Sequence, residues 1–170
     1  MSLGYVEELA TRYYEKKGYI IIPNIYFQLD KEMTGKGVAG WSDIDLLALK
    51  PDEIIVVQCK SFLGTSKSEK VAEEIINWYK YAIDFLNKDK LWKKWLKKRK
   101  LKKHLVVDTT IKKTEPILKE NKIEIISYED MLKELLKMLK PGTEARKGKE
   151  DDAIIRLLCA MIDKKLIKEI

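Results

Sequence analysis

Along the N-terminal part of the chain, apolar and polar residues are spaced first as in a helix and then as in a strand. Residues 4–17 predict an amphipathic helix, which a following glycine would end. Residues 19–29 are rich in β-branched and aromatic side chains and predict a strand. Pro23 in that strand indicates a sheet edge or a bulge, because proline cannot donate a ladder hydrogen bond. Residues 30–41 contain three glycines and predict a loop.

The next stretch, residues 42–62, predicts two strands joined by a Lys-Pro-Asp-Glu turn. If the turn is centred between its proline and its aspartate, Asp45 lies opposite Gln58 and Asp43 lies opposite Lys60. Opposed residues of an antiparallel pair point to the same face, so these four polar side chains are expected to cluster. A one-residue bulge at the turn would change this pairing.

Apolar residues surround this expected polar cluster. Toward the turn the same face becomes apolar, and the opposite face, which begins with Ile44 and Leu46, is apolar throughout. A buried carboxylate or lysine costs several kcal/mol unless it is paired or binds a metal. The pattern leaves two interpretations open: a functional site, or a strand end at the surface with an ordinary ion pair between Asp43 and Lys60.

Helical and strand-like patterns alternate in the rest of the chain, and their order predicts an α/β domain with a mixed sheet. The expected helices are residues 68–86, 113–121, 128–140 and 151–168, and the expected strands are 104–110 and 123–126. A polar linker precedes the last helix, which either packs on the domain or mediates a dimer.

One segment makes the chain basic. Residues 87–103 hold ten Lys/Arg and one acid, while the whole chain has a formal net charge of +7. We expect this segment to be helical, with Trp92, Trp95 and Leu96 anchoring it to the core. Its charge would attract nucleic acid through counterion release, and a solvated lysine-rich face is the other interpretation. The residues expected to contact nucleic acid are Lys93, Lys94, Lys97, Lys98 and Arg99, together with Lys36 in the glycine-rich loop.

Composition excludes several classes of protein. The two cysteines lie a hundred residues apart and provide neither a zinc site nor a disulfide framework. The one histidine, His104, excludes sites that need two. No apolar run is long enough to cross a bilayer, and residues 1–10 lack the features of a secretory signal. With 170 residues, 45% of them hydrophobic, the chain is expected to be a single-domain cytoplasmic protein with no membrane partner.

The hairpin residues resemble the core motif of the PD-(D/E)xK nuclease superfamily. That motif is an acidic residue on one strand and Glu/Gln-x-Lys on the next, which here is Asp45 followed by Gln58-Cys59-Lys60. The glutamine is similar to the D…QxK form of Mrr-type restriction endonucleases, whereas the related archaeal Holliday junction resolvases usually have glutamate. The resemblance covers about residues 4–136.

The resemblance implies a restriction endonuclease-like αβββαβ core, in which helices flank a central mixed sheet, plus a C-terminal helix. The nuclease-like domain would occupy residues 1–140, with 87–103 as a basic helical insertion. Residues 141–170 would be a linker and an amphipathic helix. The first helix of the superfamily carries a glutamate before a glycine and a strand, for which Glu7 is the better match and Glu8 the alternative.

The resemblance also implies roles for individual residues. Mg²⁺, or Mn²⁺ in its place, would be bound by Asp45, Gln58 and the main-chain carbonyl of Cys59. Glu7 would hold metal-bound water or complete the coordination shell. Lys60 would orient or activate the attacking water and stabilise the developing charge.

These roles predict a metal-dependent DNA endonuclease of the Mrr type. The neutral amide of Gln58 brings less negative charge than a glutamate, so metal binding is expected to be weaker. Two alternatives stay open: a Holliday junction resolvase-like nuclease, and a non-catalytic nucleic-acid-binding protein on the same fold. DNA is the expected partner, and a homodimer is a further expectation because nucleases that act on duplex DNA are often two-fold symmetric.

Overall fold

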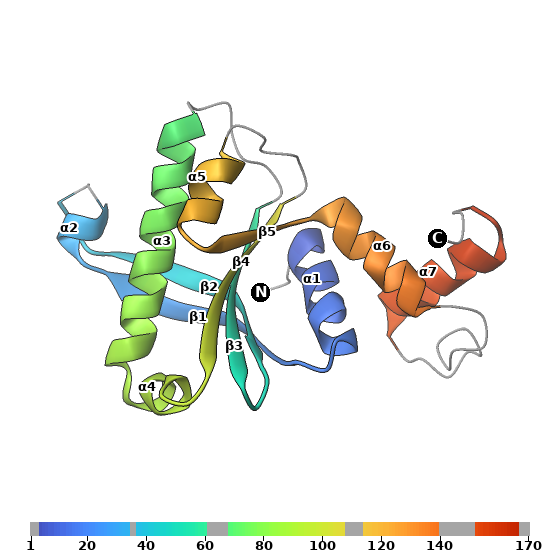
Figure 1. Ribbon diagram of the computed structural model, residues 1–170, viewed down its shortest axis with the longest axis horizontal. Helices are drawn as coiled ribbons and strands as arrows, with labels where there is room; N and C mark the ends of the chain where they lie inside the picture. The colour runs from blue at the N-terminus through green and yellow to red at the C-terminus, as the bar shows by residue number, and fades with distance from the viewer. Residues whose placement is uncertain (1–3, 35–36, 61–67, 108–113, 140–151, 167–170) are drawn as a thin grey trace.

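A computed structural model of the chain describes residues 4–34, 37–60, 68–107, 114–139 and 152–166. At its centre is a five-stranded sheet with strands in sequence order (Figure 1). The first three strands are antiparallel neighbours, and the last two run parallel to the third. The predicted mixed α/β sheet is therefore confirmed. The strands are β1 (Ile20–Leu29), β2 (Gly40–Leu49), β3 (Glu53–Lys60), β4 (Lys100–Val107) and β5 (Ile123–Ser127).

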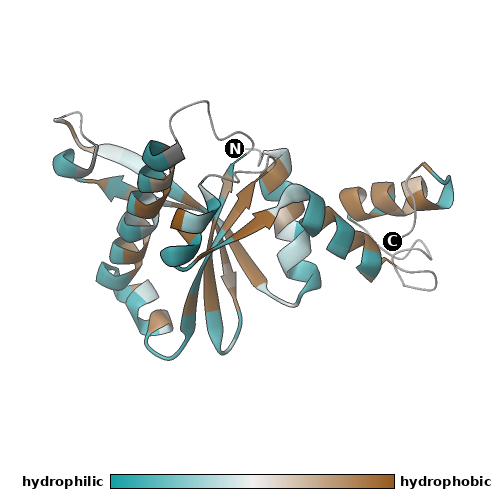
Figure 2. Cartoon of the chain, turned by 45° about the horizontal axis from the view of Figure 1, so that its top comes forward, coloured by the Kyte–Doolittle hydropathy of each residue, from teal (hydrophilic) through white to brown (hydrophobic). Residues whose placement is uncertain are grey.

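Helices cover both faces of this sheet, and their apolar sides point inward (Figure 2). On one face lies α1 (Tyr5–Lys16), with α6 (Tyr128–Met138) and α7 (Ala153–Asp163) packed beside it. The other face is covered by α3 (Ser68–Lys88) together with α4 (Lys90–Leu96) and α5 (Glu115–Glu120). The short helix α2 (Lys31–Thr34) joins β1 to β2, where the sequence predicts a loop.

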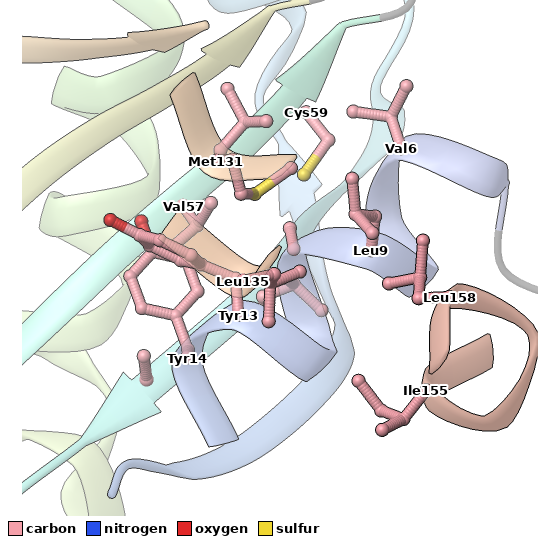
Figure 3. Packing of buried hydrophobic residues seen from close by; sticks show 14 of the residues in the cluster. Val6, Leu9, Tyr13, Tyr14, Val57, Cys59, Met131, Leu135, Ile155 and Leu158 are labelled. Atoms are coloured by element: carbon pink, nitrogen blue, oxygen red, sulfur yellow. The ribbon is translucent and has the colours of Figure 1, made fainter. Parts of the chain in front are cut away.

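The sheet thus separates two hydrophobic cores. The core under α1 contains Leu46 and Val57 from the central hairpin, and Figure 3 shows α1, α6 and α7 converging on it. The core under α3 contains Leu47 and Val56 from the same two strands. This division follows from the strand period of two, which sends neighbouring side chains to opposite faces.

The C-terminal helix packs on the domain. Ile155, Leu158 and Ile162 are buried in the core under α1, and Arg12 of that helix forms an ion pair with Asp152, the N-cap of α7. Helix α7 ends at Asp163, earlier than the predicted end at residue 168. The buried side of α7 is therefore occupied by this chain's own core.

The basic segment is only partly helical, which corrects the prediction of a helical insertion over 87–103. Helix α4 ends at Leu96, and β4 begins at Lys100 instead of at residue 104. The last four residues of the segment form the start of β4, and successive side chains there have different surroundings, as is usual in a strand. Leu101 packs against the core under α3, and Lys102 forms an ion pair with Glu53 at 2.6 Å.

None of the helices in the described ranges is both long enough and apolar enough to cross a membrane.

A buried polar contact joins α1 to the middle of the sheet. The hydroxyl of Tyr14 lies 2.8 Å from Nδ1 of His104, and the hydroxyl of Tyr79 donates to the main-chain carbonyl of His104 at 2.6 Å. Burial lowers the pKa of His104, which favours the neutral imidazole. A neutral imidazole has one acceptor nitrogen, and Tyr14 supplies a donor for it.

We therefore expect Tyr14→Phe to lower the free energy of unfolding by about 1–3 kcal/mol, since it leaves a buried imidazole nitrogen without a partner. Urea denaturation at pH 8 measures this change. The control is Tyr81→Phe, which removes a hydroxyl that has no hydrogen bond within the described part of the chain. An equal loss of stability in both variants would contradict the assignment.

Candidate active site

Two opposed residues interrupt the pairing between β1 and β2. The register is continuous from Ile20 opposite Leu49 to Leu29 opposite Gly40, except that Asn24 and Asp45 form no pair. Asn24 has a φ of 54°, in the left-handed region, where asparagine is tolerated better than most residues. The interruption predicted from Pro23 is thus present one residue further on, at the sheet edge.

This interruption changes which face each side chain takes. Ile44 and Leu47 lie in the same core, under α3, although strict alternation would place Ile44 with Leu46. Ile22 and Ile25 on β1 are related in the same way. The prediction that Ile44 shares the opposite face with Leu46 is therefore wrong, because both strands shift their alternation at the unpaired positions.

The strands β2 and β3 separate at the same place. Their ladder contains four pairs, from Leu49 opposite Ile54 to Leu46 opposite Val57, which confirms the predicted register near the turn. It does not continue to the predicted pairs Asp45–Gln58 and Asp43–Lys60.

A side chain takes the place of the ladder at this point. Hydrogen-bonded residues alternate in an antiparallel pair, and the turn bond from Lys50 N–H to Glu53 C=O implies that the N–H of Cys59 points toward β2. Oδ2 of Asp45 accepts this N–H at 2.6 Å. The Asp45 carboxylate therefore lies between the two strands where they diverge.

The Asp45 carboxyl group has an unusual electrostatic environment. Its pKa is raised from 3.8 to about 6, mainly by burial, which the hydrogen bond from Cys59 only partly offsets. The negative charges of Asp43 and Glu7 contribute to this rise, while the positive charge of Lys60 opposes it. Asp43, Glu7 and Lys60 are thus near enough to Asp45 to act on its charge.

Glu7 is placed by the first turn of α1. Its Oε2 accepts the main-chain N–H of Gly4 at 2.7 Å, which closes the N-terminus of the helix. The alternative glutamate, Glu8, pairs instead with Arg12 at 2.8 Å. The field of Glu7 also acts on Cys59, whose pKa is raised well above its usual value mainly by burial. Of the two glutamates, Glu7 belongs to the surroundings of Asp45.

Gln58 contributes a buried oxygen that has no partner. Its side chain is 4% exposed, and Oε1 has no hydrogen bond within the described part of the chain. Its neighbours Val57 and Cys59 point to the core under α1, so Gln58 leaves β3 on the face toward α3. An unpaired buried acceptor costs about 1–3 kcal/mol, unless something else satisfies it.

Lys60 is half-buried at the end of β3 and forms no ion pair with any residue in the described ranges. The ordinary pair with Asp43, which was one interpretation of the sequence, is therefore absent there. The polar groups do not share one face of a regular hairpin. Glu7 approaches from α1, Asp45 lies between the strands, and Gln58 starts from the opposite side of the sheet.

This set of oxygen atoms fits a hard divalent cation in part. Among the residues that the structure describes, no three His, Cys, Asp or Glu side chains gather closely enough to hold a metal ion by themselves. The Gln58 amide oxygen without a partner and the Asp45 carboxyl with a raised pKa are both groups that a cation would satisfy. One oxygen of Glu7 is engaged by Gly4.

The basic segment lies at the other end of the sheet from these residues. Arg99 donates through Nε to the carbonyl of Lys50 at 3.2 Å, and the N–H of Lys100 donates to Asp52 at 2.8 Å. Both contacts are to the turn between β2 and β3, whereas Lys60 is the last residue of β3. Lys36 falls outside the described residues.

The tryptophans of the basic segment have different roles. Trp92 and Leu96 pack against the core under α3, as predicted. Trp95 does not: it is 38% exposed, and the guanidinium of Arg99 lies 4.5 Å from its ring centre. Arg99 is thus occupied with structural contacts, while Lys93, Lys94, Lys97 and Lys98 are exposed.

Sequence reasoning missed Asn24, the residue that stands opposite Asp45. Pro23 signalled a distortion of the strand, and an asparagine that follows it is a residue suited to the left-handed region. That combination could have located the interruption, but not the fact that Asp45 faces it.

The raised pKa of Asp45 predicts a stability cost of its ionised form. Because the pKa is about 6 in the folded protein and 3.8 ordinarily, the group stabilises the fold at low pH and loses that contribution as the pH rises through 6. Asp45→Asn keeps an acceptor for Cys59 but cannot ionise. We expect its free energy of unfolding to exceed that of the wild type by about 1–3 kcal/mol at pH 8 in EDTA.

Urea denaturation at pH 5 and pH 8 tests this expectation, and the difference should be smaller at pH 5. Asp30→Asn, which changes an exposed carboxylate, is the matched control. A difference between Asp45→Asn and the wild type that does not vary with pH would contradict the proposed environment of this carboxyl group.

Comparison with known families matches residues 4–126 to the family described as nuclease-related domain. The matched range includes α1 and all of β5 except its last residue, so it includes Glu7, Asp45, Gln58 and Lys60 and leaves out α6 and α7. No curated protein matches the chain. The prediction of a nuclease-like domain is confirmed at this level, while the Mrr-type and resolvase relations stay predictions. Since the match covers well over half of the chain, the protein belongs to the nuclease-related domain family.

Proposed function

We propose that the protein is a metal-dependent DNA endonuclease, with Mg²⁺ or Mn²⁺ as its cofactor and a site of the Mrr type. The observation that supports this most is a nuclease-related domain that combines a carboxyl group whose pKa is raised to about 6, on Asp45, with a buried amide oxygen, on Gln58, that has no hydrogen bond to any described residue. Perturbed carboxyl groups beside unsatisfied polar atoms are typical of functional sites.

Asp45 and Gln58 would hold the cation, together with the main-chain carbonyl of Cys59 and with Glu7 at the edge of the site. The bound cation would supply positive charge that polarises the scissile phosphodiester. Above pH 6 the Asp45 carboxyl group is mostly ionised and available as a ligand, while the N–H of Cys59 holds one of its oxygens in place.

Lys60 would position the attacking water and stabilise the charge that develops on the phosphate. Its ammonium group is a compact donor of three hydrogen bonds on a flexible stem, which suits both tasks. In the described ranges no carboxylate neutralises it within ion-pair distance, so its charge stays available to a substrate anion. The expected DNA substrate would bring that anion to the end of β3.

The experiment that tests this function is cleavage of a supercoiled plasmid and of a four-way junction, with Mg²⁺ or Mn²⁺. We expect metal-dependent nicking that falls at least 100-fold in Lys60→Ala, because one donor to a developing charge typically contributes that much. Lys133→Ala, which removes an exposed lysine of α6 paired with Glu129, is the control and should cleave normally.

Preferential cleavage of the junction would favour the resolvase-like alternative over the Mrr type. Absence of cleavage with either metal, or equal cleavage by Lys60→Ala and wild type, would overturn the proposal. The non-catalytic alternative is favoured by one specific observation, the neutral glutamine at position 58 in place of a carboxylate. A homodimer remains part of the proposal, and sedimentation with and without DNA measures it.

The substitution Gln58→Glu distinguishes a metal-binding role of position 58 from the non-catalytic alternative. The added carboxylate should lower the Mg²⁺ concentration for half-maximal activity by about tenfold, because it adds negative charge to the ligand set. In EDTA the same variant should be less stable than the wild type, since it buries a second carboxyl group near Asp45. Plasmid nicking over a range of Mg²⁺ concentrations measures the first effect, and thermal unfolding in EDTA measures the second. A variant that is stabilised in EDTA would contradict the assigned role.

A further inference from the structure

Exposed lysines gather on α4 and at the start of β4. We call this surface the basic corner, and Figure 1 shows α4 at the lower end of the sheet, where β4 begins. Its lysines all lie on a short stretch of chain that folds around the end of α3. The basic corner consists of Lys90, Lys93, Lys94, Lys97, Lys98 and Lys100.

The positive charge of the basic corner is not compensated within the described part of the chain, where none of its lysines forms an ion pair. Lysines elsewhere do: Lys88, Lys119 and Lys133 each pair with a carboxylate one helical turn away. Among the lysines of α4, only Lys93 has an acid at that spacing, and this acid, Asp89, is the N-cap of the helix.

The acidic groups near the basic corner are engaged elsewhere, with one exception. Asp89 accepts the main-chain N–H groups of Leu91 and Trp92 as the N-cap of α4. Asp84 pairs with Lys88, and Glu53 pairs with Lys102. Asp52 is exposed at the turn, and its carboxylate forms no ion pair with any of the described residues.

Apolar packing and hydrogen bonds fix the basic corner on the domain. Trp92 and Leu96 pack against the core under α3, and Arg99 donates to the carbonyls of Lys50 and Trp95 at 3.2 and 2.9 Å. Because this segment is already fixed on the domain, several of its charges can contact one rigid polyanion without the entropy cost of ordering the segment on binding.

The basic corner is also remote from the candidate active site. Lys100 lies opposite Glu53, the first residue of β3, and Lys60 is the last. Seven residues of strand separate these positions, which corresponds to about 23 Å at about 3.3 Å per residue. The lysines of α4 are therefore too far away to act on a phosphate bound at Lys60.

We propose that the basic corner binds the phosphate backbone of duplex DNA and anchors it at a distance from the site of cleavage. This inference rests on the proposed function for the substrate, but the binding is separate from the chemistry. A duplex that reaches from the basic corner to Lys60 spans about seven base pairs, at about 3.4 Å per pair. A rigid duplex keeps such a distance without the entropy loss of a flexible single strand.

The side chains favour backbone contact over base stacking. The exposed lysines are point charges that bind phosphate without reading sequence. A single strand would need free aromatic faces, but one face of Trp95 is covered by Arg99, and Trp92 is half-buried. The one aliphatic side chain that is exposed among the lysines is Leu91, at 59%, which is little apolar area for insertion into a lipid surface.

The test is binding of a fluorescent 30-base-pair duplex in EDTA, where no cleavage can occur, measured by anisotropy from 50 to 300 mM salt. One variant combines Lys93→Gln, Lys94→Gln, Lys97→Gln and Lys98→Gln. The control combines Lys80→Gln, Lys119→Gln, Lys133→Gln and Lys137→Gln, which are exposed lysines of other helices. Both variants lose the same net charge, so a difference between them reports position and not total charge.

We expect the basic corner variant to bind at least about 30-fold more weakly at 100 mM salt, with a salt slope reduced by about three to four. The control should stay within about threefold of the wild type. Equal weakening of both variants, or no weakening of the first, would overturn the inference. Tighter binding to phosphatidylglycerol vesicles than to the duplex would overturn it in favour of a membrane surface.

Lys60→Ala separates this inference from the proposed function. It should lose cleavage, yet its duplex binding should still weaken at least about 30-fold when the four substitutions of the basic corner are added to it. Binding that depends on the basic corner in a protein without cleavage activity would reject the endonuclease and retain the anchor. Cleavage by a protein whose duplex binding does not change with the basic corner substitutions would retain the endonuclease and reject the anchor.

Discussion

The hydrogen bond from the main-chain N–H of Cys59 to the carboxylate of Asp45 is the contact on which the candidate site depends. It takes a donor that points toward β2, so the two strands part there and leave room for polar groups in an otherwise apolar sheet. Asn24, in the left-handed region opposite Asp45, lets the neighbouring strand follow this change without losing its register. A local departure from strand geometry thus creates the site while both cores stay packed.

The site is electrostatically unfavourable as it stands. A carboxyl group with a pKa raised by burial lies near two other acids, and the buried amide oxygen of Gln58 has no hydrogen bond to any residue that the structure describes. Each of these features costs stability, and proteins keep such costs mainly where a ligand relieves them. A cation would lower the energy of the Asp45 carboxylate and satisfy Gln58 together. The same features that destabilise the fold are therefore the ones that support the proposed chemistry.

Charge is divided between the two ends of the sheet. The acids gather where β2 and β3 separate, and the lysines of the basic corner gather at the turn end, where α4 and β4 meet. The four ladder pairs and the parallel register of β3 and β4 keep these ends apart as a rigid spacer. In the proposed function, one end would act on a phosphodiester while the other holds the duplex.

The sequence alone was sufficient for the order of the strands and for the register near the hairpin turn, because hydrophobic period and turn chemistry are local properties. It also singled out Asp45, Gln58 and Lys60 as candidates for the site, which stays a prediction. It also indicated a distortion near Pro23. It could not place Ile44 on the face toward α3, end α4 at Leu96, or show that the basic segment lies far from Lys60. Those facts depend on the hydrogen bond that Asp45 accepts from Cys59 and on the pairing of β4 with β3. Such long-range pairings form only when the whole sheet is assembled.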